Sequence, residues 1–190
     1  PFSLDHISLW LLEESDQWTI VDSGLATEEI IEAWEQLFTE HFKGKPLKRV
    51  ICTHMHPDHV GLAGWLCKRD QGTLYMSRGE YTYCRTLLSD KGREAPDDAI
   101  NFYHSAGLTT EQLFHYRATF GWFGKLVKPL PHSFCRLQAG NVITIGEHQW
   151  QILIGSGHSP EHICLYNTAQ NILISGDQLL PTILSNISVW

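Results

Sequence analysis

The sequence His-Met-His-Pro-Asp-His at residues 54–59 gathers four metal-binding side chains within six positions. The apolar run Val-Ile-Cys at 50–52 precedes it and a second apolar run follows at 60–66, as expected where a buried strand passes into a helix. Metal sites need ligands that rigid elements hold at both ends of such a loop. The stretch therefore predicts a metal site on a strand-to-helix loop, because a helix cap alone explains only one of the four side chains.

Within this hexapeptide the spacing divides the ligands into two pairs. Side chains alternate along an extended segment, so His54 and His56 share one side and can bind one ion. Pro57 fixes φ, and Asp58 and His59 then turn away with the entering helix, which leaves them free for a second ion. Imidazoles with a carboxylate favour zinc, or iron or manganese, over calcium and magnesium.

The rest of the chain predicts a layered α/β architecture. Strand and helix alternate first, with a helix capped by Thr27, and a series of strands follows. The expected strands lie at 7–12, 18–21, 50–52, 73–76, 142–145, 150–154, 163–166 and 172–174. Between them, residues 78–128 are rich in aromatic side chains and helical spacing, and prolines end this stretch at 129–131. We interpret 78–128 as a helical insertion within one domain at 1–190, either plain core or a wall or lid of a substrate pocket.

Composition limits the classes of partner. The formal net charge of −7 gives no electrostatic basis for binding nucleic acid or an anionic membrane. Five cysteines without a C-x-x-C pair indicate buried thiols in a reducing compartment. No signal peptide and no run of eighteen apolar residues appears in the sequence shown, so we expect a soluble, cytoplasmic protein. The expected partner is a small-molecule substrate, with a homodimer as the candidate assembly.

Two later segments also place a metal-binding side chain on a loop directly after an expected strand. His158 stands on a glycine-rich loop directly after an expected strand, and Asp177 follows Gly176 at the end of the next hairpin. Glycines beside a ligand let the backbone approach closely without steric cost.

The order H-x-H-x-D-H, then G-H-S-P-x-H at 157–162, then S-G-D at 175–177 resembles the metallo-β-lactamase-fold hydrolases over essentially the whole chain. The stretch 176–181 is similar to the glyoxalase-like bacterial branch of that family. The resemblance implies an αβ/βα four-layer sandwich with its metals at the edge between two sheets. It also implies two metal positions: a first held by His54, His56 and His158, and a second held by Asp58 and His59, with Asp177 bridging both.

One ligand of the family pattern is missing. A last histidine well after the bridging aspartate completes the second position in this family, and no histidine follows His162 here. We expect that the chain is truncated at its C-terminal end, and a natural one-metal site is the alternative. His162 is not assigned to a metal, and Asp22 is expected to support the floor of the site by hydrogen bonds. Surface positions are expected for the histidines without ligand spacing: His6, His41, His104, His115, His132 and His148.

The resemblance implies hydrolysis by a zinc-bound hydroxide, because two metals lower the pKa of bound water from about 15.7 toward 7. Asp58 would orient this nucleophile or pass its proton to the leaving group. A thioester, ester or lactone is the expected substrate. A phosphodiesterase or ribonuclease is the first alternative, with only the cluster of lysines and Arg49 at 43–49 in its favour. A non-catalytic, metal-stabilised binding module is the second, suggested by the missing ligand.

Overall fold

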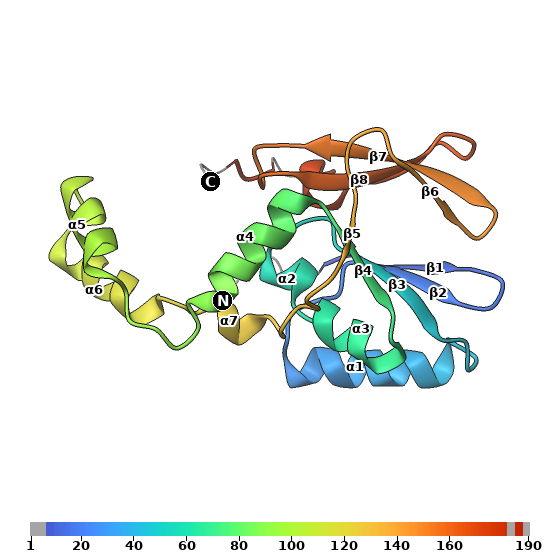
Figure 1. The fold of residues 1–190 in the computed structure, drawn as a ribbon, viewed down its shortest axis with the longest axis horizontal. Coiled ribbons are helices and arrows are strands. Elements are labelled where there is room, and N and C mark those ends of the chain that lie inside the picture. Colours follow the sequence, from blue (N-terminus) through green and yellow to red (C-terminus); the bar gives the residue numbers. More distant parts are fainter. Residues whose placement is uncertain (1–6, 182–184, 188–190) are drawn as a thin grey trace.

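The computed structural model describes residues 7–181 and 185–187, in which two sheets lie face to face (Figure 1). The first sheet is mixed, because β1 runs antiparallel to β2 whereas β2 to β5 are parallel. Its order is β1 (Trp10–Glu13), β2 (Trp18–Val21), β3 (Leu47–Ile51), β4 (Thr73–Met76) and β5 (Cys135–Arg136). The second sheet is antiparallel, in the order β6 (Val142–Ile145), β7 (His148–Gly155), β8 (His162–Asn167) and β9 (Ile172–Ile174).

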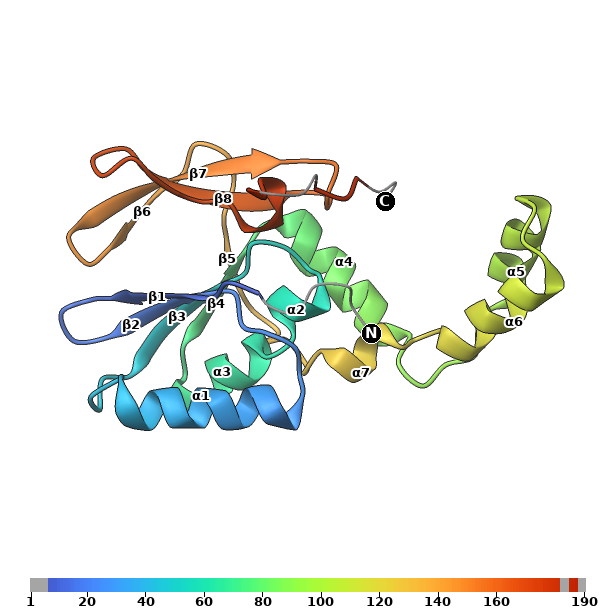
Figure 2. The same ribbon diagram turned by 180° about the vertical axis from the view of Figure 1, so that it is seen from behind.

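Two helices, α1 (Glu28–Glu40) and α3 (Ala63–Asp70), cover the outer face of the first sheet (Figures 1 and 2). In the described part of the chain no helix covers the outer face of the second sheet. The described residues therefore form three layers of the expected four-layer sandwich, namely one layer of helices and the two sheets. The remaining helical elements are α2 (Pro57–Val60), α4 (Arg78–Ser89), α5 (Asp97–Ser105), α6 (Thr110–Thr119), α7 (Phe123–Leu126) and the short 3-10 helix η1 (Gly176–Gln178).

The core has two halves because successive strand residues point to opposite faces of a sheet. Val50 packs beneath the helices, whereas its neighbour Ile51 packs between the two sheets, and neither is exposed to solvent. Helix α1 contributes Trp34 and Phe38 to the first half, and Thr27 caps it as predicted by accepting a hydrogen bond from a backbone N–H of the first turn. This double packing fixes β3, and therefore fixes the loop that follows it.

The structure confirms the predicted order of elements and corrects several details. The first strand is Trp10–Glu13 and not 7–12, because it pairs only with the four residues of β2. The helix expected after the hexapeptide is divided into α2 and α3. Strand β5 was not predicted, since two exposed residues carry no hydrophobic pattern, and one of them, Cys135, is the exception among five otherwise buried cysteines.

Residues 78–128 are helical, as predicted, but they fall into two parts. Helix α4 packs on the main core through Cys84, which is fully buried. Helices α5 and α6 form a hairpin that projects away from both sheets (Figures 1 and 2). A small cluster of its own, centred on Ala95, Ile100 and Leu113, holds this hairpin together. A role as a lid stays a prediction.

No helix within 7–181 combines the length and the apolar character that crossing a bilayer requires.

Candidate metal centre

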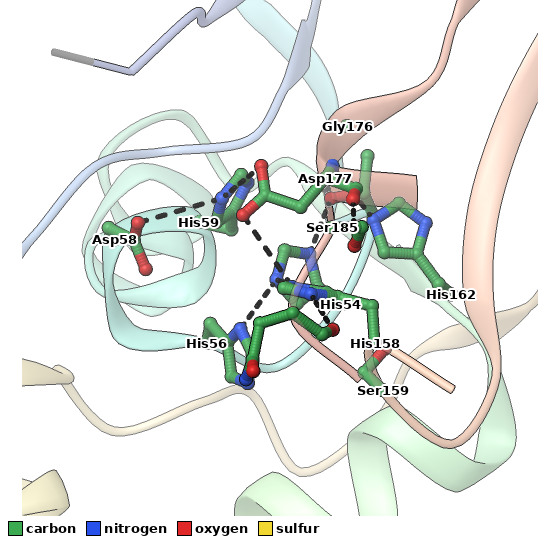
Figure 3. A network of polar contacts seen from close by, with 12 residues as sticks. His54, His56, Asp58, His59, His158, Ser159, His162, Gly176, Asp177 and Ser185 are labelled. Atoms are coloured by element: carbon green, nitrogen blue, oxygen red, sulfur yellow. Dashed lines mark hydrogen bonds and ion pairs between the residues drawn. The ribbon is translucent and has the colours of Figure 1, made fainter. Parts of the chain in front are cut away.

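The predicted site residues come from four loops that each follow a strand. The side chains of the last three loops point toward one another (Figure 3). The first sheet contributes the segment after β2 and the hexapeptide after β3. The second sheet contributes the loop after β7, with His158, and η1 after β9, with Asp177. Residues that are more than a hundred positions apart in the chain therefore meet, as the resemblance implied.

The first group of atoms that could hold a metal ion belongs to His54, His56 and His158, and these atoms all lie within 4.8 Å of one another. His54 Nε2 is 2.9 Å from His56 Nδ1 and 3.1 Å from His158 Nε2. Burial, reinforced by the neighbouring imidazoles, lowers the pKa of His56 to about 4 and that of His54 well below its ordinary value. Both rings are therefore neutral at pH 7, which is the form that binds metals.

The second group consists of His54, His59 and Asp177. His59 Nδ1 lies 2.9 Å from Asp22 Oδ2, so its Nε2 faces Asp177 Oδ1 at 3.3 Å. This Nε2 is buried and makes no hydrogen bond. The other oxygen of Asp177, Oδ2, lies 3.5 Å from His158 Nε2, so the carboxylate faces both groups. A buried ring nitrogen without a hydrogen bond, aimed at a carboxylate, fits a metal ion between them.

Asp58 lies at the more open side of the site. Its Oδ2 is 3.7 Å from His59 Nε2, and its side chain is 31% exposed. Neither ligand group includes it. Its predicted roles, as a ligand and as an acid–base residue, stay predictions.

Asp22 supports the floor of the site, and this prediction is confirmed. Its carboxylate accepts hydrogen bonds from the backbone N–H and the hydroxyl of Thr53 and also contacts His59. The Thr53 hydroxyl lies 3.0 Å from His54 Nδ1. One buried aspartate therefore orients a histidine of each group. Its backbone has a φ of 64°, a left-handed conformation that aspartate tolerates better than most residues.

His162 contacts the two groups without joining either. It is fully buried, stacks on His54 with ring centroids 4.6 Å apart, and accepts a hydrogen bond of 3.2 Å from the backbone N–H of Asp177. His6 lies outside the described residues. The other histidines expected at the surface are all exposed: His41, His104, His115, His132 and His148.

Sequence reasoning missed Glu80, which is fully buried beside the site. Its carboxylate accepts hydrogen bonds from the Met55 N–H, the Ser159 hydroxyl and the Glu161 N–H. The only local signal is the spacing Ser-x-x-Glu from Ser77, which is typical of a capping box and points to a helix start instead of distant loops.

Metal binding at the second group is expected to release a proton at pH 7. Burial lowers the pKa of His59, but the carboxylates around it, Asp22 foremost, outweigh burial and raise this pKa to about 10. The ring is therefore protonated at pH 7 without metal, and it must lose a proton to become a ligand. Calorimetric zinc titrations in buffers of different ionisation enthalpy measure this release. The variant His59→Ala is expected to bind zinc at the first group without it, and equal proton release by both proteins would contradict the assignment.

Comparisons with known proteins agree with this geometry. Residues 3–189 match the family described as the Metallo-beta-lactamase superfamily. The crystal structure of a Beta-lactamase domain protein from Burkholderia ambifaria is 39% identical with a TM-score of 0.84, over 100% of this chain and 55% of that chain. Acyl-coenzyme A thioesterase MBLAC2 from Homo sapiens is 26% identical over 91% of this chain and 58% of its own length.

A more distant structure, TTHA1623 in a di-iron-bound form, is 21% identical with a TM-score of 0.61, over 98% of this chain and 75% of that chain. The chain thus spans between half and two thirds of the Burkholderia and human relatives. The family match extends over nearly the whole chain, and its ligand motifs meet at one edge of two facing sheets. This chain belongs to the metallo-beta-lactamase superfamily.

Proposed function

We propose that the chain carries the catalytic centre of a metal-dependent hydrolase that cleaves a thioester, ester or lactone of a small acid. The observation that carries this proposal is a pair of adjacent ligand groups that both include His54. The two carboxylate oxygens of Asp177 face one histidine of each group, His59 and His158. Imidazole and carboxylate donors at this density are typical of zinc, and a bound zinc ion activates water and polarises a carbonyl group.

The side chains around the groups divide the work. His54, His56 and His158 would hold one ion, and His59 and Asp177 would hold a second, with Asp22 fixing the orientation of His59 through Nδ1. Asp58 is the acid–base residue in this proposal, since its carboxylate is near His59 and open to solvent. Water adds its oxygen to the carbonyl carbon, Asp58 takes the proton that water loses, and the C–S or C–O bond breaks as Asp58 returns that proton to the leaving group.

A thioester is favoured over a phosphodiester by the position of the basic residues. Lys45, Lys48 and Arg49 all pair with carboxylates, at 2.6, 2.8 and 3.3 Å. None of them lies beyond the middle of β3, and their ion pairs hold them against Glu13 and Glu14, whereas the hexapeptide follows the last residue of that strand. Their charges are therefore neither free nor near the ligand groups. The similarity to a human acyl-coenzyme A thioesterase supports the same choice.

Substrate panels decide between these readings. Zinc-loaded protein is expected to hydrolyse model thioesters or lactones faster than model phosphodiesters or single-stranded RNA. His56→Ala, which removes a ligand of the first group only, is expected to lower that rate by at least about 100-fold, more than the loss of a residue that merely supports a ligand. Cleavage of RNA without thioester or lactone hydrolysis would favour the phosphodiesterase alternative.

The metal itself needs a separate measurement. Elemental analysis of the purified protein distinguishes zinc from iron, which is the competing ion because TTHA1623 has a di-iron-bound form. Tightly held metal with no turnover on any substrate of the panel would identify a metal-stabilised binding module instead of an enzyme.

A further inference from the structure

Glu80 joins the two loops that carry the first ligand group. The Met55 N–H, between His54 and His56 in the chain, donates a hydrogen bond of 2.9 Å to Glu80 Oε2. On the other side, the Ser159 hydroxyl and the Glu161 N–H donate bonds of 2.7 Å each to Glu80 Oε1. One carboxylate therefore uses one oxygen for the loop of the first sheet and the other oxygen for the loop of the second.

The surroundings of Glu80 make this connection rigid. Both Glu80 and Ser159 have no exposed surface, so water does not compete for these bonds. A return contact strengthens the link, because the Gly79 N–H donates a bond of 2.7 Å to the carboxylate of Glu161. Glu80 also lies in the first turn of α4, where the helix dipole favours a negative charge.

The start of α4 does not need the Glu80 side chain as a cap. The Ser77 hydroxyl already accepts the Glu80 N–H, so the helix start is capped by the serine. In a capping box the glutamate would turn back to its own helix start. Here the three bonds of its carboxylate go to the two ligand loops instead.

We propose that Glu80 is a positioning residue that sets the distance of His54 and His56 from His158. This inference rests on the proposed metal site, but Glu80 itself touches neither metal nor substrate. Residues that orient ligands from behind in this way typically contribute about 10–100-fold to metal affinity.

The isosteric variant Glu80→Gln tests the proposal. Glutamine keeps the shape but only one acceptor oxygen, and it presents an NH₂ group to one set of N–H and O–H donors. The zinc dissociation constant, measured by competition with a chromophoric chelator, is expected to rise about 10–100-fold. The absorption spectrum of the cobalt-substituted protein is expected to change, because the ligand geometry changes.

Glu14→Gln is the matched control. Glu14 is also a buried carboxylate with several partners, namely Thr19, Lys48 and Arg49, but it lies beside the first residues of β3. Loss of its charge is expected to lower stability without changing zinc affinity or the cobalt spectrum. A Glu80→Gln protein with the zinc affinity and cobalt spectrum of the unmodified protein would overturn the proposal.

Ser159→Ala keeps the test decisive if Glu80→Gln does not fold. It removes one of the three hydrogen bonds and is expected to weaken zinc binding about fivefold, the equivalent of one ordinary hydrogen bond. Unchanged affinity in this variant would also overturn the proposal. Failure of the unmodified protein to bind zinc at all would instead reject the proposed function, so the two failures are distinguishable.

Discussion

Replacing His54 with alanine is expected to abolish zinc binding at the first ligand group and to lower hydrolysis by well over about 100-fold. His54 is the one residue that both groups share, and its ring lies within 4.8 Å centroid distance of the rings of His56, His59 and His158. Its Nδ1 is occupied by the Thr53 hydroxyl, which leaves Nε2 for the metal.

His148→Ala is the matched control for this prediction. His148 begins β7, is exposed, and lies at the opposite end of that strand from the loop with His158. Zinc content by elemental analysis and initial rates on a thioester are measured for both variants. Full zinc content and an unchanged rate in His54→Ala would show that His54 does not hold a metal ion.

Replacing Asp22 with alanine is expected to lower the free energy of unfolding by about 3–5 kcal/mol, as for other broken buried ion pairs. Asp22 is 1% exposed, and its loss leaves the N–H and hydroxyl of Thr53 and the Nδ1 of His59 without their acceptor. Alanine is also strained at a φ of 64°, where aspartate and asparagine are tolerated.

Denaturant unfolding in the presence of a chelator measures this effect apart from metal binding. Asp22→Asn is the informative control, because it tolerates the left-handed backbone and keeps one acceptor oxygen, so its loss of stability is expected to be clearly smaller. Equal stability of the alanine variant and the unmodified protein would contradict the role of Asp22 as the common support.

The parts of the site that sequence reasoning predicted are those with local patterns. The ligand roles of His54, His56 and His59 could be inferred from their spacing within six residues, because side chains alternate along a strand. The apolar run before them marks that strand. His158 and Asp177 needed the family resemblance, because no local rule says that loops a hundred residues apart meet.

The parts that escaped prediction depend on contacts between distant segments. Glu80 looks like an ordinary helix-start residue, and only the folded chain brings Met55 and Ser159 to its two oxygens. The direction of the α5–α6 hairpin also could not be predicted from the sequence. Its aromatic residues predicted helices correctly, yet periodicity does not say whether a helix pair packs on the body or projects from it.

Zinc titration of the metal-free protein, followed by the initial rate of thioester hydrolysis, tests the central claim most directly. The proposed centre predicts a rate that is negligible without zinc, rises with each addition and becomes constant at a stoichiometric amount of metal. His54→Ala is predicted to stay inactive throughout. A rate that does not respond to zinc, or one that responds equally in His54→Ala, would contradict the assignment of this cluster as a hydrolytic metal centre.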